Sequence, residues 1–111
     1  MRPSSSTPLL ARLPALILGL VLSVSVPFAI AADTLPDIQR LMKQGQMPQA
    51  LEKVDAYIST KPKDAQGRFL KGLILTEMGR PGDAIPVFTK LTEDYPELPE
   101  PYNNLAVLYA Q

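Results

Sequence analysis

The residue types that carry most protein chemistry are sparse in this chain of 111 residues. It contains no cysteine and no histidine, which excludes thiol nucleophiles, disulfides, the usual zinc sites and histidine-based acid–base catalysis. Its serine and threonine hydroxyls therefore lack a histidine base, and its lysines are scattered along the sequence. We expect no enzymatic activity, no cofactor and no metal site.

Two short segments come closest to a reactive site. The acids Glu93, Asp94 and Glu97 are neighbours in sequence, but they lie around the predicted end of a helix at Pro96, where solvated acids are common. The glycine-rich segment 79–82 (GRPG) contains a proline, which removes one of the backbone amides that a phosphate-binding loop uses. Neither segment predicts catalysis or phosphate binding.

The charge balance bears on the class of partner. Basic and acidic residues both number 11, and from Asp33 onward there are nine basic and eleven acidic residues. The part after this point therefore carries a charge near −2, which is ordinary for a soluble surface. We expect no nucleic acid partner and no binding to anionic lipid.

The N-terminal third has the composition of a targeting segment. Residues 1–12 carry two arginines and no acid, and residues 13–26 are an apolar run without a charge. Small residues of the A-x-A type follow, so we predict a signal peptide over 1–31, with cleavage after Ala31 or, as the competitor, after Ala32. The alternative is an uncleaved anchor, because residues 13–32 are about long enough to cross a bilayer. Export to the periplasm or medium is expected, and the alternative is an inner-membrane anchor facing the periplasm.

A repeat runs through the remainder of the chain. Residues 34 positions apart share their type or character: Gly45 and Gly79, Ala50 and Ala84, Leu51 and Ile85, Val54 and Phe88, Pro62 and Pro96. The same register continues through Leu41, Leu75 and Tyr109, and through Ile38, Gly72 and Ala106. Within each period apolar residues recur at three- and four-residue steps, which predicts two helices per period, with breaks at the glycines and prolines.

One proline conflicts with this pattern. If the second helix of the second period begins at Pro81, then Pro86 lies in its interior, which costs about 3 kcal/mol. We therefore expect this helix to begin late or to be kinked.

A helical hairpin of 34 residues whose helices are broken by glycine and proline at these positions resembles the tetratricopeptide repeat. The positions that carry the resemblance are Gly72, Leu75, Gly79, Ala84, Phe88 and Pro96 in one unit and Tyr102, Leu105, Ala106 and Tyr109 in the next. The unit before them matches less well, with Ile38 at the place of a small residue and Val54 at that of an aromatic one. The resemblance implies an all-α fold, in which hairpins stack as a short right-handed solenoid behind a signal-peptide helix. The units are 32–63 (degenerate), 64–98, and 99–111, the first helix of a third unit.

The resemblance also implies a function. Members of the family bind proteins or peptides in a concave groove lined by the first helix of each unit. Matched to that pattern, the groove residues are Gln39, Met42, Lys43, Gln66, Phe69, Leu73, Thr76, Glu77, Asn103 and Val107. An exported adaptor or scaffold is expected. The alternative is the N-terminal scaffold of a longer or membrane-anchored envelope protein whose active part lies beyond residue 111.

The third unit stops at Gln111, within its first helix. We therefore expect Leu105, Leu108 and Tyr109 to lack the helix that would pack beneath them. Either the chain is the N-terminal piece of a longer array, or self-association or a self-capping helix covers this surface, because repeat arrays need a polar terminal face.

Overall fold

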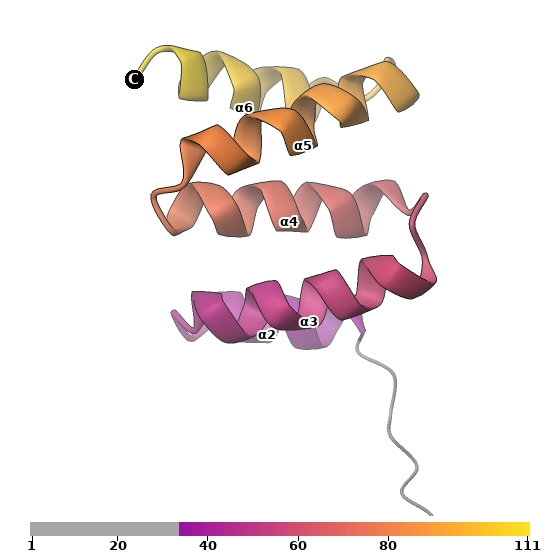
Figure 1. Cartoon of the computed structure of the whole chain (residues 1–111), viewed down its shortest axis with the longest axis vertical. Coiled ribbons are helices and arrows are strands. Elements are labelled where there is room, and N and C mark those ends of the chain that lie inside the picture. The colour runs from indigo at the N-terminus through magenta and orange to yellow at the C-terminus, as the bar shows by residue number, and fades with distance from the viewer. Residues whose placement is uncertain (1–33) are drawn as a thin grey trace, which may run out of the picture. The chain divides into compact units, whose positions relative to one another are not determined.

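The computed structural model describes residues 34–111, which form five α-helices and contain no β-strand (Figure 1). The helices are α2 (Leu35–Lys43), α3 (Met47–Thr60), α4 (Ala65–Glu77), α5 (Pro81–Asp94) and α6 (Pro99–Tyr109). This confirms the prediction of an all-α chain over these residues. The predicted signal peptide lies outside them. Within the described part, no helix combines the length and apolarity needed to span a membrane.

Local sequence sets the beginnings of the helices. The side chain of Thr34 accepts a hydrogen bond from the backbone N–H of Asp37, and that of Asp64 accepts one from Gly67 at 2.9 Å. These bonds satisfy backbone donors that have no partner within the first helical turn. The other three helices, α3, α5 and α6, begin with proline at one of their first two positions, where its missing N–H costs nothing.

Two glycines end the first helix of each period. Gly45 and Gly79 have φ angles of 75° and 71°, in the left-handed region that side chains with a Cβ disfavour. At the end of α4, Gly79 N–H donates to the carbonyl of Thr76 and Arg80 N–H to that of Leu75, at 3.0 and 2.9 Å. The equivalent pair of bonds ends α2. This arrangement satisfies two terminal carbonyls and reverses the chain within three residues.

Each helix packs against the next one in sequence, and α2 also contacts α4. In Figure 1 the pair α2 and α3, then α4, α5 and α6 follow one another as successive layers. Side chains buried between the layers form two clusters. The first comprises Ile38, Ala50, Val54, Tyr57, Leu70 and Ile74, and the second comprises Leu75, Ala84, Phe88, Leu91 and Leu108. Helix α4 contributes to both clusters, so it links the layers on its two sides.

Of the two outcomes expected for α5, a late start or a kink, the late start is wrong, because the helix begins at Pro81 and contains Pro86 in its interior. The missing N–H of Pro86 would have bonded the carbonyl of Gly82, one turn earlier. Both residues are exposed, so water can hydrate that carbonyl. Exposure of this side of α5 therefore lowers the cost of an interior proline.

Candidate functional site

Two open clefts lie between the first helices of successive periods. The α4–α6 cleft has a volume of about 400 Å³ and is lined by Ala65, Gln66, Phe69, Leu98, Glu100 and Pro101. The α2–α4 cleft has a volume of about 270 Å³ and is lined by Gln39, Met42, Lys43 and Leu70. Residues predicted from the sequence to face a partner therefore line both clefts, and they do so from the helices that the 34-residue period made equivalent.

The α4–α6 cleft has an apolar lining with polar groups beside it. Phe69 is half-buried and packs edge to face on Phe88, with ring centroids 5.6 Å apart. Pro101 of α6 is fully buried and contributes an apolar ring to the lining. Gln66 and Glu100 are exposed, and the amide and carboxylate supply hydrogen-bonding groups. Such a cleft can accept an apolar side chain and fix its orientation through polar contacts.

The α2–α4 cleft is lined by a basic residue, Lys43, whereas the α4–α6 cleft is lined by an acidic one, Glu100. Leu70 is 5% exposed and Met42 is half-buried, so together they form an apolar surface. Gln39 is half-buried, and the exposed Lys43 is the last residue of α2, where the helix dipole favours a cation. The unbranched thioether of Met42 can adapt to side chains of different shape.

The remaining predicted groove residues do not line either cleft. Leu73 is half-buried and packs against both buried clusters, and the hydroxyl of Thr76 donates to the carbonyl of Gly72 at 2.8 Å. Glu77, Asn103 and Val107 are exposed. Sequence reasoning also missed lining residues of the clefts: Ala65, Leu70, Leu98, Glu100 and Pro101. The prolines flanking Glu100 were the available signal, since they set where α6 begins and hence which residues reach α4.

The residues assigned to repeat positions divide into buried and exposed sets. Among those in residues 34–98, Ala50, Ala84 and Phe88 are 0% exposed, Leu75 is 3% exposed, and Gly72 is buried, while Pro62 and Pro96 are exposed beyond the ends of their helices. In α6, Leu105 is half-buried and Tyr102, Ala106 and Tyr109 are exposed. The expectation that Leu108 lies on an uncovered surface is wrong. It is 5% exposed because it packs with Phe88 and Leu91 of α5.

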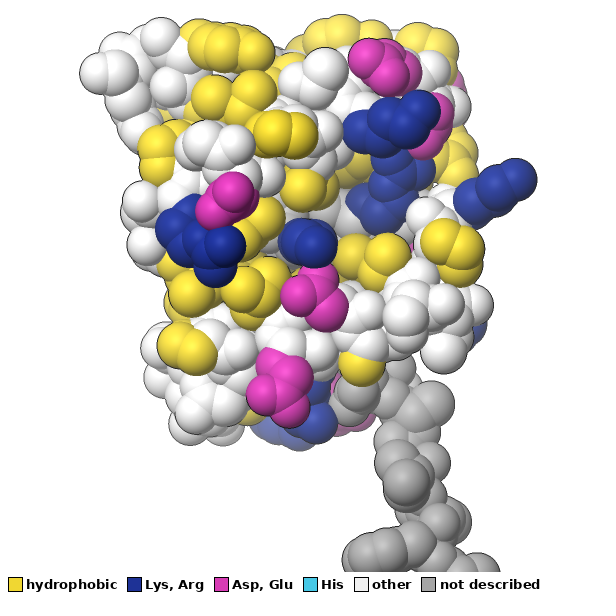
Figure 2. Space-filling model, in the orientation of Figure 1, with side chains coloured by type: hydrophobic (Ala, Val, Ile, Leu, Met, Phe, Trp, Pro, Cys, Tyr) yellow, Lys and Arg dark blue, Asp and Glu magenta, His cyan; other side chains and the backbone are white. Residues whose placement is uncertain are grey.

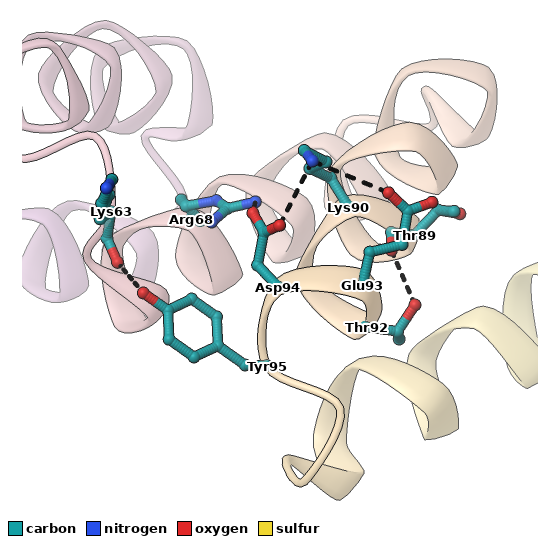
Figure 3. Close-up of polar contacts among 8 residues, drawn as sticks. All are labelled: Lys63, Arg68, Thr89, Lys90, Thr92, Glu93, Asp94 and Tyr95. Carbon is teal, nitrogen blue, oxygen red and sulfur yellow. Dashed lines mark hydrogen bonds and ion pairs between the residues drawn. The ribbon is translucent and has the colours of Figure 1, made fainter.

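Two of the acids near Pro96, Glu93 and Asp94, form ion pairs with basic side chains (Figure 3). Asp94 accepts hydrogen bonds from Arg68 at 2.9 Å and from Lys90 at 3.2 Å. These bonds, Arg68 first and then Lys90, hold the pKa of Asp94 below its ordinary value, the reverse of what a general acid requires. Beside them the hydroxyl of Tyr95 donates to the carbonyl of Lys63. The cluster therefore joins the end of α5 to the beginning of α4.

Opposite charges also alternate over the surface. Figure 2 shows Lys and Arg side chains beside Asp and Glu side chains, with hydrophobic ones between them. Lys71 pairs with Asp55 at 2.8 Å and Arg80 with Asp83 at 2.8 Å. Within residues 34–111 there is no group of three acidic, histidine or cysteine side chains that could hold a metal ion.

Comparisons with protein-family models, with curated proteins and with solved structures found no match to this chain. The resemblance to the tetratricopeptide repeat therefore stays a hypothesis, carried by the residues that recur at 34-residue spacing. The two clefts and the side chains that line them are the features of the described residues that could hold a binding partner.

Proposed function

We propose that this chain is an exported adaptor of the tetratricopeptide type, which binds a protein or peptide segment along its first helices α2, α4 and α6. The observation that carries the proposal is the position of the two clefts. They lie between these helices, and Gln39, Met42 and Lys43 line one while Gln66 and Phe69 line the other.

Several features support helical hairpins that stack on one another. The glycines that end α2 and α4 have the same conformation and are 34 residues apart. Ala50 and Ala84, also separated by 34 positions, are both fully buried. A unit of this kind buries its apolar face only against its neighbours, and α4 here packs against both the preceding and the following helix.

The lining of the clefts indicates the chemistry of the partner. Both clefts combine apolar side chains with one exposed charge, Lys43 in one and Glu100 in the other. An extended segment with two apolar side chains matches this pattern, since each cleft accommodates one of them. The charge beside each cleft would then select among segments by the residues that flank the apolar ones.

Export is supported by the composition of residues 1–31, with arginines before an uncharged apolar run and an A-x-A site after it. The intact mass of the chain recovered from fractionated bacterial cells tests this part. A periplasmic species that begins directly after Ala31 or Ala32 supports export with cleavage. A species that retains Met1 in the membrane fraction contradicts cleavage.

Site-specific photo-crosslinking tests the binding surface. A photoreactive phenylalanine analogue replaces Gln66 or Lys43, both exposed beside the clefts, and Glu52 of α3, also exposed, serves as the control position. The proposal expects the same partner to be captured from Gln66 and Lys43 but not from Glu52. Met42→Glu, which places a charge in the α2–α4 cleft, should reduce the crosslink. Equal capture from all three positions would contradict the proposal.

A further inference from the structure

Each cleft of the proposed groove contains one charged side chain that has no partner within the described part of the chain. Lys43 lines the α2–α4 cleft and Glu100 lines the α4–α6 cleft, and both residues are exposed. Neither the Lys43 ammonium nor the Glu100 carboxylate forms an ion pair or a hydrogen bond with another of residues 34–111. Both charges therefore stay available to groups outside these residues.

The other charges on α2, α4 and α6 are used differently. With the exception of Glu77, they are paired within the chain, in the ion pairs Arg40–Asp37, Arg68–Asp94 and Lys71–Asp55. Glu77 lines neither cleft. Every charge on these three helices that lines a cleft is thus one that the described residues leave unpaired, which is the pattern expected where charges select a partner.

A glutamine amide lies beside each of the two charges. Gln39 lines the α2–α4 cleft and Gln66 lines the α4–α6 cleft. Over residues 34–111 neither side-chain amide forms a hydrogen bond. An amide both donates and accepts, so it matches the N–H and C=O groups of a peptide backbone. An extended segment has these groups free, whereas a helix bonds them internally, so the two glutamines favour an extended partner.

Helix α4 sets the distance between the clefts, because it lines both of them, with Leu70 in one and Phe69 in the other. An α-helix with its side chains is about 10 Å across, so the cleft centres are roughly 10 Å apart. In a polyproline II segment, side chains three residues apart point the same way and are about 9 Å apart. Two apolar side chains separated by two residues therefore span the clefts.

On the basis of the proposed groove, we propose that its partner is an extended segment with opposite charges at its two ends. An acidic residue follows or precedes the apolar side chain in the α2–α4 cleft and pairs with Lys43. A basic residue stands in the same relation to the apolar side chain in the α4–α6 cleft and pairs with Glu100. A segment with like charges at both places is disfavoured, because one of them meets a charge of its own sign.

Four labelled peptides with blocked ends test this pattern against the chain as recovered from cells. Each has two leucines separated by two serines, with one charged residue outside each leucine. Two peptides carry aspartate and lysine, in either order, and the other two carry two aspartates or two lysines. By fluorescence anisotropy, one mixed-charge peptide, the one whose direction fits the groove, should bind roughly fivefold or more tightly than either like-charge peptide.

Exchanging the charges of the clefts should change this preference in a defined order. Lys43→Glu should make the two-lysine peptide bind best, and Glu100→Lys should do the same for the two-aspartate peptide. The double variant should prefer the mixed-charge peptide that runs in the opposite direction. The urea midpoint of each variant should stay close to that of the parent, because both side chains are exposed. Glu52→Lys, exposed on α3, is the matched control and should keep the parent's preference.

The outcomes separate this inference from the proposed function on which it rests. Equal binding of all four peptides, or a preference that the substitutions do not change, would overturn the charge pattern and leave the groove in place. A preference changed as much by Glu52→Lys would overturn it too, because net charge would then explain the effect. Absence of saturable binding by every peptide would overturn the proposed pattern, and the crosslinks from Gln66 and Lys43 decide separately whether the clefts bind a partner.

Discussion

The ring of Phe88 occupies the space that a side chain at Gly72 would fill. A Cβ at Gly72 would lie 2.4 Å from Cζ of Phe88, far inside van der Waals contact. At the equivalent place one period earlier, Ile38 and Val54 are both fully buried in one cluster. A larger residue on the first helix is thus matched by a smaller one on the second, and a glycine by a phenylalanine. The interior is therefore filled in both periods. The larger side chain of the pair lies on the first helix in one period and on the second helix in the other.

Gly72→Ala should therefore destabilise the fold although alanine is the better helix former. Overpacking a filled core costs about 1–3 kcal/mol, which exceeds the helix-propensity gain of about 1 kcal/mol at most. Urea unfolding of the two chains measures the difference. Phe88→Leu should be less costly in the Gly72→Ala background than alone, because the shorter side chain makes room for the new Cβ. Gly82→Ala is the control: a Cβ there meets nothing within 4 Å, so its effect should be small.

The repeat made most of the helical architecture predictable. The helix ends at Gly45 and Gly79 and the buried pair Ala50 and Ala84 follow from residue types that recur at fixed spacing. Such positions are governed by backbone conformation and local packing, which sequence records directly. The late start expected for α5 failed for a different reason. The cost of Pro86 depends on whether its side of the helix is covered, and this is a tertiary property.

The clefts were less predictable than the helices. Pro101 lines the α4–α6 cleft although its sequence context marks only the beginning of a helix. Leu108 is buried because α5 lies next to it, whereas helical periodicity alone grouped it with Tyr109. Gly67 drew no attention in the sequence, yet a Cβ there would come within 2.7 Å of the Tyr57 ring. These features depend on how neighbouring helices approach, which no periodicity within one helix specifies.

Gly79→Ala should cost about 1–2 kcal/mol, because its φ of 71° lies in the left-handed region and a Cβ there adds strain rather than a clash. Gly79→Asn should cost less, since asparagine tolerates this conformation better than other residues with a side chain. Thermal and urea unfolding measure the order. Gly45, with nothing within 4 Å of a Cβ, should give the same ranking. Equal destabilisation by alanine and asparagine would contradict the explanation that the left-handed backbone conformation causes the loss of stability.

Asp64 holds two bonds at once. Its Oδ2 accepts the N–H of Gly67 at 2.9 Å, which caps α4, and the hydroxyl of Tyr57 at 3.1 Å. Asp64→Ala should destabilise the fold by about 0.5–2 kcal/mol through loss of the cap. Asp64→Asn keeps an acceptor oxygen and should cost less. Tyr57→Phe should cost about 0.5–1.5 kcal/mol in the parent chain and nearly nothing in the Asp64→Ala chain, as a double-mutant cycle of urea unfolding would measure.

Asp94 links stability to pH at the end of α5. Its hydrogen bonds from Arg68 and then from Lys90 lower the pKa of its carboxyl in the folded chain, whereas the unfolded carboxyl has a pKa of about 3.9. The unfolded chain therefore binds this proton first, so the stabilisation is present above about pH 4 and is lost as the pH falls through the folded pKa. Urea midpoints measured from pH 7 down to pH 2 should fall less steeply in Asp94→Asn than in the parent chain.

The control for this effect is Glu97→Gln, an exposed acid beyond the end of α5. It should leave the pH dependence nearly unchanged. High salt should also weaken the effect in the parent chain, because the Asp94 side chain is 35% exposed and its pairing with Lys90 is open to solvent. The less exposed contact with Arg68, whose side chain is 13% exposed, should persist in salt. Arg68→Gln should therefore flatten the dependence of stability on pH more than Lys90→Gln does. The reverse order would contradict this assignment, because it would mean that Lys90 lowers the pKa of Asp94 more than Arg68 does.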